Sequence, residues 1–298
     1  MQDSEMMAQM TSKPGFIAAL DQSGGSTPGA LRAYGIPDSA YQSDAEMFEL
    51  MHRMRVRIMT SPAFTGEKVI GAILFEKTMD GQAEGQPVPS YLWKERGVVP
   101  FLKVDKGLEA EQDGVQLMKP IPGLDALLER ASGLGVFGTK MRAVVNLASR
   151  SGIAAIVEQQ FQVAEQIMAH GLVPILEPEA SIKSEQREGA EEILAAELKK
   201  GLDALPADRK VMLKLTIPVQ TNLYAALVDH PRVVRVVALS GGFSRADACQ
   251  KLARNRGMIA SFSRALVSDL HNDMSDSEFD RALGAAVDEI FQASTAKG

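Results

Sequence analysis

The chain has 298 residues, and its 45% hydrophobic and 23% charged residues are typical of a globular protein. One cysteine excludes an internal disulfide and any cysteine-rich zinc or iron–sulfur site. The 32 basic and 38 acidic residues give a net charge of −6, which argues against a broad nucleic-acid-binding face. The start of the chain lacks the basic region of a secretory signal, and no apolar run is long enough to span a bilayer. We therefore expect a cytoplasmic protein without membrane or nucleic-acid partners.

Short apolar runs rich in β-branched residues recur along the chain, each with the length of a buried strand. In chain order these predicted strands are Phe16–Asp21, Val69–Glu76, Val99–Asp105, Val136–Arg142, Val173–Glu179, Val211–Thr216, Val233–Ser240 and Met258–Arg264. Most are separated by stretches with helical periodicity, of which Ile153–His170 is the clearest and Glu188–Leu202 and Asp276–Ala293 are others. More than one helix is expected in the region 30–59.

This alternation of strand and helix predicts parallel strands joined by helical crossovers. Length alone suggests two domains of about 150 residues, but α/β barrels of about 250 residues form single domains. No linker, fixed repeat or low-complexity tract divides the chain. We therefore predict the α/β class and a single (β/α)8 TIM barrel over residues 1–298.

Many predicted strands end in charged or polar residues. In a parallel barrel these ends, and the loops after them, build the active site. Three pairs have i, i+2 spacing, so that both members lie on one face of their strand: Lys103/Asp105, Lys140/Arg142 and Glu177/Glu179. A single strand-end charge is often just solvated. Several charged pairs facing into a barrel mouth are costly unless they pair with each other or bind a ligand, so the pattern favours a functional site.

Lys214 is flanked by apolar residues within Val211–Thr216. A lysine in this setting is either a partner in a buried ion pair or an amine tuned for chemistry. Desolvation and nearby cations favour the neutral amine, which can attack a carbonyl and form a Schiff base. Glu177 and Glu179 would then supply general acid–base groups.

Loops after three predicted strands have the composition of phosphate sites. Gly241 and Gly242 follow the seventh strand and let backbone N–H groups turn toward an anion at the start of a helix. Ser261–Arg264 adds a fork-shaped cation after the eighth strand, and Asp21–Ser26 is a third candidate after the first. A Gly-Gly pair alone is usually a tight turn, but barrels often bind phosphate at these strand ends.

Four histidines fall outside the C-terminal ends of the predicted strands: His52, His170, His230 and His271. Their positions argue against a histidine-ligated catalytic zinc, and no metal site is predicted. Cys249 is expected to be a small packed residue in a helix, and the methionines of Met47–Met59 are expected in the core.

Seven motifs stand at these strand ends: Ala18-Ala-Leu-Asp-Gln-Ser-Gly-Gly-Ser26, Phe101-Leu-Lys-Val-Asp-Lys-Gly107, Phe137-Gly-Thr-Lys-Met-Arg142, Leu172-Val-Pro-Ile-Leu-Glu-Pro-Glu179, Val211-Met-Leu-Lys214, Leu239-Ser-Gly-Gly242 and Ser261-Phe-Ser-Arg264. Together and in this order they make the chain resemble class I fructose-bisphosphate aldolases, most closely the short bacterial form. The likeness runs from about Lys13 to Val287. It implies a lyase that cleaves fructose 1,6-bisphosphate reversibly to dihydroxyacetone phosphate and glyceraldehyde 3-phosphate, without metal or cofactor, in glycolysis or gluconeogenesis.

The resemblance also implies roles for individual residues. Lys214 matches the Schiff-base lysine, and Lys140 matches the lysine beside it. Glu177 matches the general acid–base residue and Glu179 its companion carboxylate, while Asp21 matches the base for the C4 hydroxyl. Substrate contacts are implied for Lys103, Arg142, Ser240, Gly241, Gly242, Ser263, Arg264, Ser23 and Ser26. Among these, Ser240, Gly241 and Arg264 match the C1-phosphate site, and Ser23 and Ser26 match contacts near the C6-phosphate.

The chain departs from the animal enzymes of this family in two places. Those enzymes end in a tyrosine that assists proton exchange at C3 of dihydroxyacetone phosphate, whereas residues 293–298 contain none. They also have glycine before the phosphate-binding arginine, where this chain has Ser263.

Two alternatives stay open at this point. One is a Schiff-base aldolase for another phosphosugar, and the other is a non-catalytic binding protein with an aldolase-like fold. Phosphate sites at both ends of the substrate favour a bisphosphate. An amine, an acid and a base together favour catalysis, because binding alone does not need all three. The oligomeric state, the direction of flux and activity on fructose 1-phosphate stay undetermined by the sequence.

Overall fold

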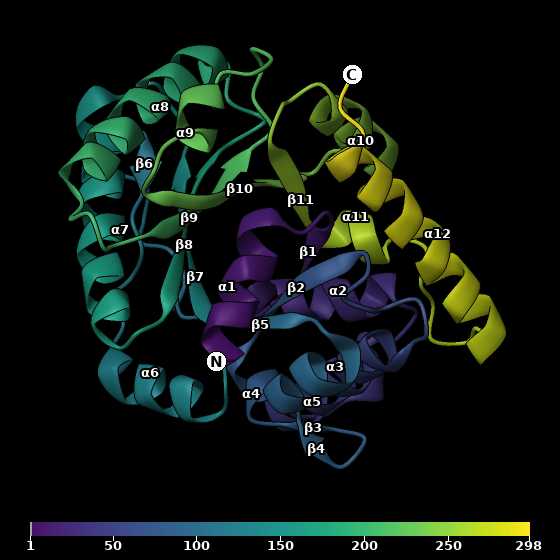
Figure 1. Ribbon diagram of the computed structural model, residues 1–298. Helices are drawn as coiled ribbons and strands as arrows, with labels where there is room; N and C mark the ends of the chain where they lie inside the picture. The colour runs from purple at the N-terminus through teal and green to yellow at the C-terminus, as the bar shows by residue number, and fades with distance from the viewer. Residues whose placement is uncertain (1) are drawn as a thin grey trace.

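In the computed structural model, which describes residues 2–298, eight parallel strands close into a barrel surrounded by helices (Figure 1). The barrel strands are β1 (Phe16–Leu20), β2 (Val69–Leu74), β5 (Val99–Lys103), β7 (Gly138–Val145), β8 (Val173–Ala180), β9 (Val211–Thr216), β10 (Val233–Leu239) and β11 (Met258–Phe262). Their order around the barrel is β5-β2-β1-β11-β10-β9-β8-β7, and pairing between β5 and β7 closes it. The predicted (β/α)8 barrel and its eight strands are confirmed.

Helices and short strands fill the connections between the barrel strands. The helices are α1 (Gln2–Ser12), α2 (Thr27–Ala33), α3 (Asp44–Thr60), α4 (Glu76–Met79), α5 (Val88–Arg96), α6 (Leu124–Gly133), α7 (Arg150–Ala169), α8 (Arg187–Ala204), α9 (Ala225–Val228), α10 (Arg245–Ala253), α11 (Arg264–Val267) and α12 (Asp276–Thr295). The short strands β3 (Gln82–Ala83) and β4 (Gln86–Pro87) form a hairpin, and β6 (Val115–Gln116) pairs antiparallel with β7. No helix within residues 2–298 has the length and apolarity needed to cross a membrane.

Local sequence explains where the long helices begin. Ser275 caps α12: its hydroxyl accepts the Glu278 N–H, and the Glu278 carboxylate accepts the Ser275 N–H at 2.9 Å, forming a capping box. Ser149 caps α7 by a single hydrogen bond, its hydroxyl accepting the Gly152 N–H at 3.1 Å. The three long helices predicted from periodicity are confirmed, and the 30–59 region contains both the end of α2 and α3.

Alternation of side chains along the strands divides the apolar core into two layers. Inside the barrel, residues such as Ile17, Phe101 and Ile175 form a small cluster. Outside it, their neighbours pack against the helices in a much larger cluster. The inner layer is apolar only in the lower part of the barrel, because farther along the strands inward-facing residues such as Lys140, Glu177 and Lys214 are charged.

Helix α1 closes the N-terminal end of the barrel. Met6 and Met10 are fully buried and belong to the inner cluster. The Gln9 side-chain amide donates to the Ile70 and Gly97 carbonyls at 2.8 and 2.7 Å, and Arg235 Nε donates to the Met10 carbonyl at 2.8 Å. The barrel therefore opens to ligands at its opposite end.

Because Met10 fills the bottom of the barrel, Met10→Ala should lower the free energy of unfolding by about 2–5 kcal/mol through lost burial and a residual cavity. Denaturant unfolding monitored by circular dichroism measures this change. Thr11→Ala, at an exposed position of the same helix, is the matched control and should shift the stability by less than about 0.5 kcal/mol. Equal effects of the two substitutions would show that α1 does not seal the barrel.

Candidate active site

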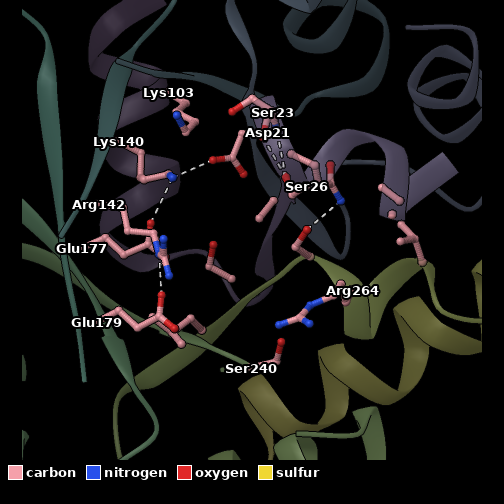
Figure 2. Close-up of a pocket in the computed structure, with 18 of the residues that line it drawn as sticks. Asp21, Ser23, Ser26, Lys103, Lys140, Arg142, Glu177, Glu179, Ser240 and Arg264 are labelled. Atoms are coloured by element: carbon pink, nitrogen blue, oxygen red, sulfur yellow. Dashed lines mark hydrogen bonds and ion pairs between the residues drawn. The ribbon is translucent and has the colours of Figure 1, made fainter. Parts of the chain in front are cut away.

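A cavity of about 930 Å³ lies at the C-terminal ends of the strands (Figure 2). All the site residues predicted from the sequence line it, except Gly242. Figure 2 shows Asp21, Ser23 and Ser26 on one side, Lys140, Arg142, Glu177 and Glu179 on another, and Ser240 and Arg264 on a third. Glu76, a further strand-end charge, instead pairs outside the cavity with Lys106 and Arg130, at 2.8 and 2.5 Å.

Strand register brings the charged residues together. In the pairing of β5 with β7, Lys103 lies opposite Lys140, and in the pairing of β7 with β8, Arg142 lies opposite Glu177. The intervening Met141 packs in the outer apolar layer, as the i, i+2 spacing predicts. The strand backbone therefore directs the charges of neighbouring strands into one small volume.

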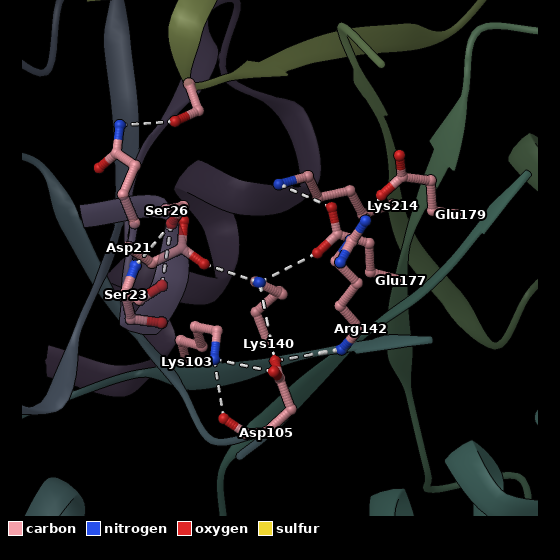
Figure 3. Close-up of polar contacts among 12 residues, drawn as sticks. Asp21, Ser23, Ser26, Lys103, Asp105, Lys140, Arg142, Glu177, Glu179 and Lys214 are labelled. Atoms are coloured by element: carbon pink, nitrogen blue, oxygen red, sulfur yellow. Dashed lines mark hydrogen bonds and ion pairs between the residues drawn. The ribbon is translucent and has the colours of Figure 1, made fainter. Parts of the chain in front are cut away.

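The centre of the site is a chain of alternating charges (Figure 3). Lys214 Nζ lies 3.1 Å from Glu177 Oε1, and the other oxygen of Glu177 lies 3.0 Å from Lys140 Nζ. Lys140 Nζ lies 2.6 Å from Asp21 Oδ2. All four side chains are buried, so each charge is compensated by its neighbours rather than by water.

The pKa values of Asp21 and Lys140 reflect this arrangement. Burial alone would raise the pKa of the Asp21 carboxyl, but the charges of Lys140 and Lys214 outweigh burial and lower it from 3.8 to about 2. Burial would likewise lower the pKa of Lys140, but Asp21, Glu177 and Asp105 raise it well above its usual range. Asp21 is thus a carboxylate and Lys140 an ammonium at neutral pH.

A second group of charges lies beside this chain. Arg142 Nε donates to Glu179 Oε2 at 2.5 Å, and Glu179 raises the pKa of Arg142, although burial opposes it. Asp105 is buried between three cationic residues: its carboxylate lies 2.8 Å from Lys103 Nζ and 3.8 Å from Lys140 Nζ, and it accepts the Arg142 backbone N–H at 3.2 Å. The sequence indicated the position of Asp105 through its i, i+2 pairing with Lys103, but assigned it no role.

The loops after β10 and β11 meet at Arg264. Gly241 and Gly242 have φ values of 61° and 108°, a left-handed conformation that favours glycine. A Cβ on Gly242 would lie 3.8 Å from an Arg264 guanidinium nitrogen, so this loop approaches the cation even though Gly242 does not line the cavity. Among the residues described, no carboxylate lies within ion-pair distance of Arg264. Its positive charge is therefore available to an anion.

The loop after β1 is fastened by local hydrogen bonds. The Ser26 hydroxyl donates to the Ser23 carbonyl at 2.9 Å and accepts the Ser23 N–H at 3.2 Å. Gln22 Nε2 donates to Ser263 Oγ at 2.7 Å, so the Ser263 hydroxyl is already bound to protein although the residue lines the cavity. The sequence did not reveal this contact, because its partners are 241 positions apart.

The residues expected to lie outside the site do so. None of the four histidines of the described chain lines the cavity. Cys249 is buried in α10, and burial raises the pKa of its thiol to about 12. All four methionines of Met47–Met59 are in the core, with Met51 and Met59 fully buried.

The model of one protein family, fructose-bisphosphate aldolase class-I, matches residues 43–226. The chain belongs to the class-I fructose-bisphosphate aldolase family. The matched residues include Lys103, Lys140, Glu177 and Lys214, and cover more than half of the chain. As a member of this family, the protein is an aldolase, a lyase on a TIM-barrel fold.

Solved structures show the same fold. One is fructose-bisphosphate aldolase from Plasmodium falciparum, in a ternary complex with TRAP and a small-molecule inhibitor. It matches with a TM-score of 0.79 and 19% identity over 99% of this chain and 95% of that one. Another is Cgl0159 from Corynebacterium glutamicum (Brevibacterium flavum), with a TM-score of 0.57 and 17% identity over 98% of this chain and 92% of that one.

Asp21 should make stability depend on pH in acid. Its pKa is about 2 in the folded state and near 3.8 when unfolded, so the unfolded state binds more protons between these values. Stability should therefore fall as the pH drops from about 4 to about 2, by about 2 kcal/mol from this residue. Denaturant unfolding at several acidic pH values measures the slope, which Asp21→Asn should reduce.

The matched control for this slope is Asp208→Asn, at an exposed position in the loop before β9. It should leave the pH dependence of wild type intact. An unchanged slope in Asp21→Asn would show that the Asp21–Lys140 ion pair does not stabilise the folded state.

Proposed function

We propose that the protein cleaves fructose 1,6-bisphosphate reversibly to dihydroxyacetone phosphate and glyceraldehyde 3-phosphate through an imine on Lys214. The observation that carries the proposal is the buried line Lys214–Glu177–Lys140–Asp21 within the cavity. It supplies a nucleophilic amine, a group able to pass a proton to and from it, and a separate carboxylate. Membership of the class-I aldolase family supports the same chemistry.

Imine formation would use Lys214 and Glu177. Glu177 Oε1 lies 3.1 Å from Lys214 Nζ, close enough to take a proton from the ammonium and leave the neutral amine. The amine attacks the C2 carbonyl of the sugar and forms a carbinolamine. Glu177 then returns a proton to the departing hydroxyl group, which leaves as water and gives the protonated imine.

Carbon–carbon cleavage would use Asp21. As an ionised carboxylate, Asp21 can take the proton from the C4 hydroxyl while the C3–C4 bond breaks. The bonding electrons move into the protonated imine, which becomes an enamine, and glyceraldehyde 3-phosphate leaves. Lys140 holds the two carboxylates apart and keeps a positive charge beside the reacting carbons. The imine accepts the electrons that a Lewis-acidic metal would otherwise accept, so we propose that the reaction needs no metal.

Substrate recognition would use the loops around the cavity. We assign the C1-phosphate to Arg264, with the Ser240–Gly242 loop and Ser263 beside it, and the contacts near the C6-phosphate to Ser23 and Ser26. Lys103 and Arg142 are assigned as substrate-contacting cations, and Glu179 as the carboxylate that holds Arg142. Supporting this assignment, Arg264 has no carboxylate partner among the residues described. We propose that the reaction serves glycolysis or gluconeogenesis in the cytoplasm.

Borohydride reduction in the presence of dihydroxyacetone phosphate tests the proposal. Because reduction converts an imine into a stable secondary amine, we expect a covalent adduct on Lys214, located by peptide mass mapping. Lys214→Arg is the control, since it keeps the positive charge but offers no amine for imine formation. An adduct on another lysine, or none, would contradict the assignment of Lys214.

Assays of fructose 1,6-bisphosphate cleavage with and without EDTA separate the alternatives. Equal activity in both is expected. Loss of activity in EDTA would favour a metal-dependent lyase, and trapping without cleavage would favour an aldolase for another phosphosugar. If neither imine trapping nor cleavage is observed, a non-catalytic binding protein is favoured.

Glu177→Gln keeps the size of the side chain but removes its titrating group. We expect kcat to fall by roughly 10²–10⁴, the usual contribution of general acid–base catalysis, with a modest change in KM. Steady-state kinetics measures this, and circular dichroism checks that the fold persists. Glu179→Gln is the matched comparison at the next inward-facing position of β8. If Glu179→Gln shows the larger loss in kcat, the acid–base role belongs to Glu179.

A further inference from the structure

Gln22 links two loops of the cavity that the proposed mechanism uses separately. It lies between Asp21 and Ser23 in the loop after β1, and its side-chain amide donates to Ser263 Oγ at 2.7 Å in the loop after β11. Strands β1 and β11 are neighbours in the barrel. The contact therefore extends their pairing beyond the strand ends, into the mouth of the cavity. We call it the Gln22–Ser263 latch.

Arg55 fixes one end of the latch. It is a buried residue of α3, and its guanidinium donates to Thr78 Oγ1 at 2.8 Å and to the Gln22 carbonyl oxygen. Among the residues described, no carboxylate lies within ion-pair distance of it, and burial lowers its pKa to about 10. A buried cation without an ion pair is costly. Its hydrogen bonds to neutral oxygens offset part of this cost, together with the Phe75 ring, whose centroid lies 5.9 Å from the guanidinium carbon. One of these oxygens is the carbonyl of Gln22, so Arg55 restrains the backbone of Gln22.

The other end of the latch, Ser263, fixes the backbone position of Arg264. Ser263 directly precedes Arg264, the first residue of α11, and the Ser263 carbonyl accepts the Leu266 N–H at 3.0 Å within this short helix. The hydrogen bond from Gln22 thus restrains the residue from which the guanidinium projects. Arg264 itself is exposed to the cavity, without a carboxylate among the described residues to hold it in place.

We propose that Gln22 is a positioning residue that holds the anion site at Arg264 in register with Asp21. Through the latch, the loop that carries the proposed base and the loop that carries the phosphate-binding guanidinium are fixed relative to each other. This inference rests on the proposed function in taking the natural anion to be the phosphate of the sugar substrate. The latch itself requires only that an anion binds at Arg264.

Calorimetric titration of the full-length protein with inorganic phosphate tests the latch without a sugar substrate. Gln22→Met keeps the length of the side chain but removes its amide, and Ser263→Ala removes the acceptor. Loss of one neutral hydrogen bond should weaken phosphate binding roughly two- to tenfold in each variant. The double variant should be no weaker than the weaker of the two single variants, because both changes break the same contact. Arg264→Ala identifies the site by abolishing the affected binding.

Gln162→Met is the matched control, because Gln162 is an exposed glutamine on the outer helix α7 whose amide bonds to Glu158. It should bind phosphate like wild type, and thermal unfolding should show that all the variants are folded. Wild-type phosphate affinity in folded Gln22→Met would overturn the latch. A fold-loss of affinity in the double variant equal to the product of the two single-variant losses would also overturn it, because the two side chains would then act independently. Absence of phosphate binding by wild type would also overturn it, because there would be no anion site to position.

Kinetics then separates this proposal from the function on which it rests. With an active enzyme, Gln22→Met should raise the KM for dihydroxyacetone phosphate in the condensation direction more than it lowers kcat. A larger loss in kcat than in KM would contradict positioning of the phosphate site. If wild type forms no imine with dihydroxyacetone phosphate, the Schiff-base proposal fails. The phosphate titration still tests whether the Gln22–Ser263 latch positions the anion site.

Discussion

The ammonium of Lys140 is almost completely buried in the mouth of the barrel, and the rest of the site is arranged around that charge. Removing an ammonium from water carries a large energetic penalty, which nearby carboxylates offset only at short range. Asp21 and Glu177 both meet this requirement and approach the nitrogen from different sides (Figure 3). Neither carboxylate could move far without exposing the other members of the chain to an unpaired buried charge. The ion pairs therefore fix the distance between the two carboxylates as firmly as apolar packing fixes the lower barrel.

The barrel makes such a cluster possible because it brings strands that are distant in sequence into register. The participants lie within β7, β8 and β9 and at the residue after β1. Each strand supplies an apolar inner layer below and a charged residue above, so that the apolar layer supports the charged one. Rigid strands hold charged groups more accurately than loops do, and the groups at the centre of this site lie on strands or directly after them.

The sequence predicted those features of the molecule that depend on local periodicity. Runs of buried residues located the eight strands, and i, i+2 spacing indicated which side chains face inward, as Lys140 and Arg142 do on either side of Met141. Resemblance to a family then supplied the candidate roles, which geometry alone does not assign. The sequence also indicated Glu76 as a strand-end charge but not its direction, because it begins a helix outside the barrel mouth. Contacts between distant segments, such as those of Arg55 and Gln22, have no periodic signal and became visible only in the fold.

The first helix illustrates how such distant contacts constrain the order in which the molecule assembles. Helix α1 leaves the ribosome before any strand of the barrel. Yet its Gln9 side chain donates to the start of β2 and to Gly97, two residues before β5, and its Met10 carbonyl accepts from Arg235 of β10. The Met10 carbonyl and Arg235 are separated by 225 positions. Contacts of this span form late, because the intervening chain must be ordered before they can close. During synthesis, α1 is therefore complete well before its partners in β2 and β10, and Met6 and Met10 cannot be buried in the inner layer until those strands exist.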